Sequence, residues 1–129
     1  MEEWTFHDIT PVYAQLYDAV KLRILSGTYV PDSRLPSVRG IAEAAGVNSA
    51  TVTRAFALLA KEKLIHRTRQ GYMVTSDTAF IEATRHSEAK ILAFTYVREI
   101  TQLGFSVKEI MQEASYCTGK LLNSRSCKR

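Results

Sequence analysis

The spacing of apolar residues near the N-terminus predicts a first helix followed by a loop. Thr10 and Pro11 form a helix start, with Thr10 as the N-cap and Pro11 at the first helical position. From there to Gly27, tyrosine and aliphatic side chains recur three or four residues apart, as they do along one face of a helix. Residues 27–36 contain a glycine, two prolines and an Asp-Ser pair, which predicts a loop.

Two shorter helices follow, joined by a tight turn. Ser37 can cap the first of them, whose apolar positions follow the i, i+3, i+4, i+7 pattern until Gly46. Either Asn48 or Ser49 can cap the second, in which the apolar spacing repeats as far as Leu59. Two short helices on either side of a glycine-containing turn predict a helix-turn-helix.

A β-hairpin is predicted directly after the helix-turn-helix. Residues 64–68 and 72–75 are short β-prone runs, and Arg69-Gln70-Gly71 lies between them, with the glycine supplying a positive φ. In this position a hairpin is a wing, although an ordinary hairpin with a polar tip would show the same pattern. The fold class is therefore mainly α with a small β-hairpin wing, forming an N-terminal winged helix-turn-helix.

The last third of the chain predicts a C-terminal α-helical hairpin. Ser76, Asp77 or Thr78 can cap a long helix that Gly104 ends, and residues 106–109 form a capping box for a second helix. Two helices joined by a short link make an αα-hairpin. Their apolar positions need a covering surface and are the candidate dimerisation residues Ala89, Ala93, Tyr96, Val97, Ile100, Leu103, Val107, Ile110, Met111 and Ala114.

The covering surface is either a second copy of the chain or the winged helix of the same monomer. Twofold association is the commonest oligomeric arrangement, and it matches the paired half-sites that helix-turn-helix dimers bind, which favours a homodimer. We therefore expect residues 1–76 to form the winged helix-turn-helix domain. Residues 77–129 are expected to form a two-helix dimerisation domain with a frayed C-terminal tail.

Charge is unevenly distributed along the chain. Residues 1–33 carry two basic and five acidic residues, whereas residues 34–74 carry seven basic and two acidic residues, a net charge of +5. A basic segment attracts a polyanion, although a solvated basic face has the same composition. Because this segment coincides with the predicted winged helix-turn-helix, double-stranded DNA is the expected partner.

The candidate DNA contacts lie in the basic segment and at the start of the third helix. Basic and amide side chains suit phosphates or the minor groove, and small polar side chains on a recognition helix suit base edges in the major groove. The predicted DNA-binding residues are Arg34, Ser37, Arg39, Asn48, Ser49, Ala50, Thr51, Thr53, Arg54, Arg67, Arg69, Gln70 and Gly71.

Two roles are expected within this set. The residues expected to position each monomer are Arg39, Arg67, Arg69 and Gln70. The residues expected to discriminate between operator sequences are Ser49, Thr51, Thr53 and Arg54. Simpler explanations stay open at two points, because the polar residues at 48, 49 and 51 can act as helix caps alone, and Arg39 can pair with Glu43 at i+4.

Several motifs resemble the GntR family of bacterial regulators. They lie at Pro11–Leu16 (PVYAQL), Gly27–Pro31 (GTYVP), Arg34–Arg39 (RLPSVR), Ile41-Ala42, Gly46-Val47, Thr51-Val52 and Gly71-Tyr72, and the resemblance covers roughly residues 9–75. It implies a winged helix-turn-helix that contacts DNA at Arg39, Asn48, Ser49, Ala50, Thr51, Thr53, Gln70 and Gly71. The chain departs from the usual family pattern with Pro31-Asp32 in place of Pro-Gly, and with Ser49 in place of Arg or Lys.

The short C-terminal part resembles the YtrA subfamily, which lacks the large effector-binding domain of other GntR regulators. The subfamily commonly represses transcription, so the resemblance implies a repressor. An effector, if one exists, has two candidate sites, the crevice between the domains and the dimer interface.

Other functional classes find less support in the sequence. There is no P-loop, GxSxG, HExxH or CxxC motif, so an enzyme, a cofactor and a metal site are not expected. Cys117 and Cys127 are interpreted as free thiols. Without a long apolar run or a signal-peptide pattern, a cytoplasmic location is expected. The main alternative is a winged helix that binds another protein as an adaptor, and RNA binding is a weaker one because Tyr72 is the only obvious stacking aromatic at the wing.

Overall fold

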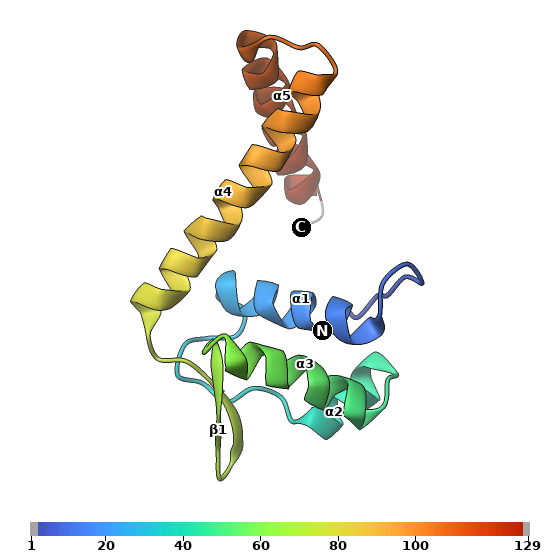
Figure 1. Cartoon of the computed structure of the whole chain (residues 1–129), viewed down its shortest axis with the longest axis vertical. Coiled ribbons are helices and arrows are strands. Elements are labelled where there is room, and N and C mark those ends of the chain that lie inside the picture. Colours follow the sequence, from blue (N-terminus) through green and yellow to red (C-terminus); the bar gives the residue numbers. More distant parts are fainter. Residues whose placement is uncertain (1–2, 128–129) are drawn as a thin grey trace. The chain divides into compact units, whose positions relative to one another are not determined.

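The computed structural model describes the backbone of residues 3–127 and the side chains of residues 3–123. Its elements, in chain order, are α1 (Val12–Leu25), α2 (Val38–Ala45), α3 (Ser49–Lys61), β1 (Ile65–Thr68), β2 (Gly71–Val74), α4 (Thr78–Gln102) and α5 (Val107–Cys127) (Figure 1). The chain divides into an N-terminal unit, residues 1–86, and a C-terminal unit, residues 87–129. The mainly helical fold with a two-stranded wing confirms the predicted fold class.

The core of the N-terminal unit is built by α1 and α3 together with the wing. Leu16 and Ile24 of α1 and Phe56 and Leu59 of α3 are fully buried and belong to one cluster of apolar side chains. Tyr72 of β2 packs edge-on against Phe56, with ring centroids 5.0 Å apart. Burying each large apolar side chain stabilises the fold by about 1.5–3 kcal/mol, so this cluster fixes the orientation of α3.

Local capping signals set the ends of the two short helices as predicted. The Ser37 hydroxyl accepts a hydrogen bond from the Gly40 backbone N–H at 2.9 Å, and Asn48 Oδ1 accepts one from the Thr51 N–H at 3.0 Å. Gly46 takes a left-handed conformation with φ +71°, which an L residue with a side chain rarely adopts. These three residues make the helix-turn-helix turn.

The predicted start of α1 is wrong by one residue. The helix begins at Val12, and Pro11, with an extended ψ of 144°, is the N-cap without any side-chain capping bond. Thr10 is not the cap; its carbonyl instead accepts a hydrogen bond from the Gln15 side-chain amide at 2.8 Å. That amide also binds the His7 carbonyl at 2.8 Å, so Gln15 organises the chain entering α1.

The segment predicted only as a loop, residues 27–36, also extends the wing. Arg34 forms an antiparallel bridge with Met73 of β2, and the Leu35 N–H donates to the Tyr72 carbonyl at 2.9 Å. Asp32 precedes this pairing with φ +60°, in the left-handed region. Asp32 stands where the GntR pattern usually has glycine, which explains the family preference: glycine takes this conformation without steric cost.

The end of α3 is tied to α1 by a polar cluster. The Tyr17 hydroxyl donates to the Glu62 carboxylate, at 2.5 Å from Oε2, and Lys21 Nζ lies 3.6 Å from the same carboxylate. Burial, and secondly the hydrogen bond to Glu62, raise the pKa of Tyr17.

Lys63, which directly follows Glu62 after the end of α3, has φ +67°, and its N–H donates to the Ala60 carbonyl. A lysine therefore occupies the position where helices commonly place glycine.

The C-terminal unit is a helical hairpin made from the last part of α4 and from α5. Gly104, with φ +91°, lies in the turn. The predicted capping box is confirmed, because the Ser106 N–H donates to Glu109 Oε1 at 3.1 Å and the Glu109 N–H donates to the Ser106 hydroxyl at 3.3 Å. The bond from the Ser106 backbone N–H, and secondly the Ser106 side chain, lower the pKa of Glu109. The α5 helix continues to Cys127, through most of the tail expected to fray; the Cys127 side chain lies outside those described.

Candidate nucleic-acid interface

The helix α3 presents a small polar surface on the side away from the core. Val52, Ala55, Phe56 and Leu59 are buried, so the exposed positions near its N-terminus are Ser49, Ala50, Thr53 and Arg54. A short helix that projects small polar side chains from its first turns has the shape and chemistry to enter a DNA major groove.

Two of the predicted contacts at this helix end have a capping role. Asn48 Oδ1 holds the Thr51 N–H at 3.0 Å and also lies 3.3 Å from the Thr51 hydroxyl, which donates to it. Thr51 is half-buried, whereas Asn48 stays exposed. The cap positions the first turn of α3, and the amide N–H groups of Asn48 remain available to a ligand.

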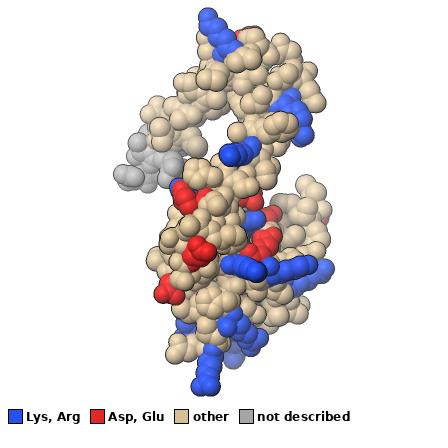
Figure 2. Space-filling model, turned by 60° about the vertical axis from the view of Figure 1, so that its left-hand side comes forward, with Lys and Arg blue, Asp and Glu red and all other residues tan. Residues whose placement is uncertain are grey.

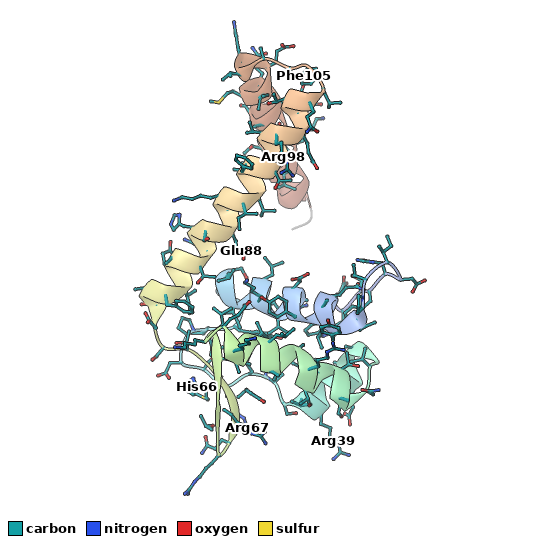
Figure 3. The ribbon with its side chains drawn as sticks, in the orientation of Figure 1. Arg39, His66, Arg67, Glu88, Arg98 and Phe105 are labelled. Atoms are coloured by element: carbon teal, nitrogen blue, oxygen red, sulfur yellow. The ribbon has the colours of Figure 1, made fainter. Side chains whose placement is uncertain are left out.

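Arg39 extends from the second residue of α2 into solvent. Its side chain is 88% exposed, and its Nε lies 3.4 Å from Glu43 Oε1, so the ion pair considered at i+4 does form. Exposed pairs of this kind contribute only about 0–1 kcal/mol, and the pairing through Nε leaves the terminal guanidinium nitrogens facing outward. Figure 3 shows Arg39 and Arg67 directed toward the same end of the N-terminal unit, away from α1.

The wing is closed by a tight turn that depends on Thr68. Its hydroxyl accepts from the Gln70 N–H at 3.2 Å and donates to the Gly71 carbonyl at 2.9 Å. Gly71 is the first residue of β2, not part of the turn as predicted, and its φ of +119° demands glycine. Arg67, Arg69 and Gln70 are exposed around this turn.

A shallow hollow of about 260 Å³ brings several predicted residues together between α2, α3 and the wing. Polar side chains from all three elements line it, with the glycine of the wing beside them: Arg34, Ser37, Thr53, Arg67, Gln70 and Gly71. Tyr72 also lines it and packs against Phe56 in the core. The hollow is therefore connected to the core through Tyr72.

Arg54 lies on a different side of α3 from this hollow. Its guanidinium carbon is 3.6 Å from the centroid of the Tyr13 ring in α1. A second hollow, of about 280 Å³, is lined by Val12, Tyr13, Asn48, Ala50, Thr51 and Arg54. Sequence reasoning missed Tyr13, because it followed the apolar spacing of α1 and nothing local links it to a residue 41 positions away.

Positive charge is in excess at the end of the N-terminal unit that carries the wing. In Figure 2, Lys and Arg side chains without acidic neighbours lie at and around the tip of the wing, whereas the Asp and Glu side chains lie away from the tip, with further Lys and Arg side chains beside them. One of the two acidic residues of segment 34–74, Glu62, pairs with Lys21 of α1. The surface that carries Arg39 and Arg67 is thus suited to a polyanion.

Two further findings concern the described residues alone. Their histidine, cysteine and carboxylate side chains form no group of three or more that would hold a metal ion. None of their helices combines the length and apolar character needed to cross a lipid bilayer.

Sequence comparisons connect this geometry with known regulators. The family model described as bacterial regulatory proteins, gntR family, matches residues 12–74. The uncharacterized HTH-type transcriptional regulator YhcF of Bacillus subtilis is 22% identical over 108 residues, covering 83% of this chain and 89% of YhcF. The HTH-type transcriptional repressor NagR of Bacillus subtilis is 39% identical over 57 residues, covering 44% of this chain and 24% of NagR.

Solved structures extend the similarity to the C-terminal helices. A GntR family transcriptional regulator from Listeria monocytogenes is 31% identical with a TM-score of 0.83, covering 86% of this chain and 98% of that one. YtrA from Sulfolobus acidocaldarius, a GntR-family transcription factor, is 31% identical with a TM-score of 0.54, covering 70% and 96%. The AraR DNA-binding domain in complex with operator ORX1 is 24% identical with a TM-score of 0.54, covering 57% and 95%, and shares the fold.

Proposed function

Because the chain belongs to the GntR family of bacterial regulatory proteins, and is a transcription regulator with a DNA-binding domain, we propose that it represses transcription as a homodimer on a pseudo-palindromic operator. Residues 1–76 would bind DNA and residues 77–129 would dimerise. The observation that carries the proposal is the polar, basic surface built from α2, α3 and the wing around Arg39, Thr53 and Arg67. We expect a bacterial regulator of this family to act in the cytoplasm.

The DNA-binding mode follows from which groups this surface exposes. Ser49 and Thr53 project from α3 toward base edges, and Arg39, Arg67, Arg69 and Gln70 are placed to hold phosphates or the minor groove. The AraR DNA-binding domain, which shares this fold, was crystallised with its operator, and that complex supports DNA as the partner. A protein-binding winged helix would favour an apolar surface at α3, and here that surface is polar.

The homodimer is supported by the apolar face of the C-terminal unit. We use this term for the exposed side chains Leu92, Phe94, Val97, Leu103, Val107, Met111, Leu121 and Leu122. Of the predicted dimerisation residues, this set includes Val97, Leu103, Val107 and Met111, whereas Tyr96 and Ile100 are half-buried. Leu103, Val107 and Met111 are 73%, 78% and 68% exposed, and Ile110 is the one buried apolar side chain among those described in this unit. Apolar surface of this extent on a small helical hairpin marks an interaction site, and a twofold pair of copies would cover it.

The proposal also includes repression as the sign of regulation and membership of the YtrA subfamily. The similarity to the repressor NagR, confined to 57 residues, supports the sign of regulation. The similarity to YtrA covers 96% of that chain, which supports membership of the YtrA subfamily.

A fluorescence-anisotropy titration tests the DNA-binding part. Wild type should prefer a duplex from its own promoter over a scrambled duplex, with affinity that falls steeply with salt. Arg39→Ala should weaken promoter binding about 10- to 100-fold, the loss expected for a charged hydrogen bond. Arg85→Ala is the matched control, because Arg85 pairs with Glu82 on α4 and should leave binding unchanged. Failure of the wild type to bind either duplex at low salt would contradict DNA binding and favour the adaptor.

Sedimentation analysis tests the homodimer. Met111→Glu places a charge on the apolar face and should weaken association at least 10-fold, because an uncompensated charge would be buried. Gln112→Glu adds the same charge at the adjacent, exposed position and should have a much smaller effect. A monomeric wild type at all concentrations would contradict the homodimer.

A further inference from the structure

The pair formed by Arg54 and Tyr13 joins two helices of the N-terminal unit. Arg54 projects from the second turn of α3, and its guanidinium carbon lies 3.6 Å from the centroid of the Tyr13 ring at the start of α1. Tyr13 is half-buried, and Arg54 is exposed despite this contact. The ring therefore covers one face of the guanidinium and leaves its N–H edges toward solvent.

The charge of Arg54 is held in place without being neutralised. None of the ion pairs of the described residues involves Arg54, whereas Arg39 pairs with Glu43. A cation over an aromatic face gains about 0.5–1 kcal/mol at an exposed site, enough to favour one orientation of a long side chain. An aromatic ring has no formal charge, so the full positive charge stays available to an anion.

The surroundings of this guanidinium add to its positive potential. It lines the hollow of about 280 Å³ that also contains the first residues of α1 and α3, among them Val12 and Ala50. The N-terminal ends of both helices carry partial positive charge, and the N-cap Pro11 of α1 provides no side-chain acceptor for the first N–H groups. A planar guanidinium with two N–H edges in such a place suits the oxygens of a phosphate.

We propose that Arg54 and Tyr13 form a second phosphate anchor for the DNA backbone, on the side of α3 that faces α1. This inference rests on the proposed DNA-binding function and deepens it. Arg54 would contact a backbone phosphate independently of sequence, and Tyr13 would be the positioning residue that holds it. This role replaces the base-reading role that the sequence suggested for Arg54.

The proposed anchor complements the one on the wing. Arg67 lines the hollow on one side of α3 and would hold the DNA backbone there, and Arg54, which lines the other hollow, would hold it on the opposite side. Because α3 is fixed in the core, a domain anchored to DNA on one side of this helix alone can pivot as a whole in the groove, whereas contacts on both flanks fix which residues meet the bases. Phosphate contacts of this kind set register and orientation without carrying sequence information.

The anisotropy titration with promoter and scrambled duplexes over a range of salt concentrations tests the anchor. Arg54→Ala should weaken binding to both duplexes by the same factor, about 10-fold, and reduce the slope of log K against log salt by about 0.9, the value for one lost phosphate contact. Arg54→Lys keeps the charge and should keep the slope. Thr53→Ala, on the base-facing side, should instead lower the ratio of the two affinities.

Variants of Tyr13 test its positioning role. Tyr13→Phe retains the ring and should bind like wild type, whereas Tyr13→Leu should weaken both duplexes equally, by about 3-fold, as expected for loss of a cation–π contact. Circular dichroism must show Tyr13→Leu to be folded; the Arg54 variants test the anchor independently. Loss of promoter preference in Arg54→Ala, or no change in affinity, would overturn the anchor while leaving the DNA-binding proposal intact. Absence of DNA binding by the wild type would instead overturn the underlying function.

Discussion

The two units of the chain bury their apolar side chains to different extents. Of the sixteen buried apolar side chains among the described residues, fifteen form the core of the N-terminal unit, and Ile110 alone belongs to the C-terminal unit. The N-terminal unit encloses Phe56 and Leu59 completely, whereas the C-terminal unit leaves Leu103 and Val107 more than 70% exposed. One unit is therefore stabilised by its own packing, and the other needs an additional surface to cover it.

Matched phenylalanine substitutions should give the largest difference in unfolding free energy between the two units. Phe56→Ala should destabilise the N-terminal unit by about 3–5 kcal/mol, because it leaves a cavity in a fully buried site. Phe94→Ala, at a side chain that is 67% exposed, should cost the monomer less than about 1 kcal/mol. Urea unfolding followed by circular dichroism measures both, and equal losses would contradict the contrast.

Protein concentration should affect the two units differently. If pairs of copies cover the apolar face, a hundredfold increase in concentration stabilises the associated helices by about 2.7 kcal/mol. The unfolding temperature of α5 should then rise with protein concentration. Trp4 packs on the N-terminal core, so its fluorescence should report an unfolding temperature that changes less. Identical curves at both concentrations would contradict this prediction.

Removing the hydroxyl of Tyr17 tests the polar connection between α1 and α3. Tyr17→Phe should destabilise the N-terminal unit by about 1–2 kcal/mol at neutral pH, because Glu62 loses its hydrogen bond.

The raised pKa of Tyr17 makes this effect depend on pH. The folded state holds the phenol proton more tightly than the unfolded state, whose pKa is near 10.0. The contribution is therefore fully present below pH 10 and decreases as pH rises above it. The difference between wild type and Tyr17→Phe should narrow above pH 10 in denaturant titrations. A constant difference would contradict this assignment.

The smallest expected effect is a gain of stability at the end of α3. Lys63→Gly should stabilise the N-terminal unit by up to about 1 kcal/mol, because glycine adopts φ +67° without steric cost. Lys61→Gly, at the last residue of α3, is the matched control and should destabilise by up to about 1 kcal/mol, because glycine has a lower helix propensity than lysine. Denaturation midpoints distinguish the two, and a loss of stability in Lys63→Gly would show that the left-handed conformation is not strained.

The features that could be predicted from the sequence are those with a local cause. Ser37, Gly46 and the capping box at residues 106–109 act within one helical turn, so nearby residues specify them. The wing strands, predicted at 64–68 and 72–75, are found at Ile65–Thr68 and Gly71–Val74.

The features that sequence reasoning missed depend on distant partners or on residues in unusual conformations. The pairing of Arg34 with Met73 and the stacking of Arg54 on Tyr13 join residues about 40 positions apart, and no short motif encodes them. Lys63 ends α3 in a conformation that usually requires glycine, so the expected signal was missing. The sequence predicted the residues of the candidate DNA surface. Their distribution between two hollows depends on the fold and could not be predicted.

The apolar face of the C-terminal unit also has a consequence for gene control. A regulator whose dimer helices depend on each other for cover would lose operator affinity when few copies are present, since single copies bind one half-site. Occupancy of the operator would then rise faster than in proportion to the number of molecules per cell. A modest change in synthesis or degradation would in that way act as a threshold, and the response to abundance would be built into Leu103, Val107 and Met111 rather than into the DNA-contacting residues.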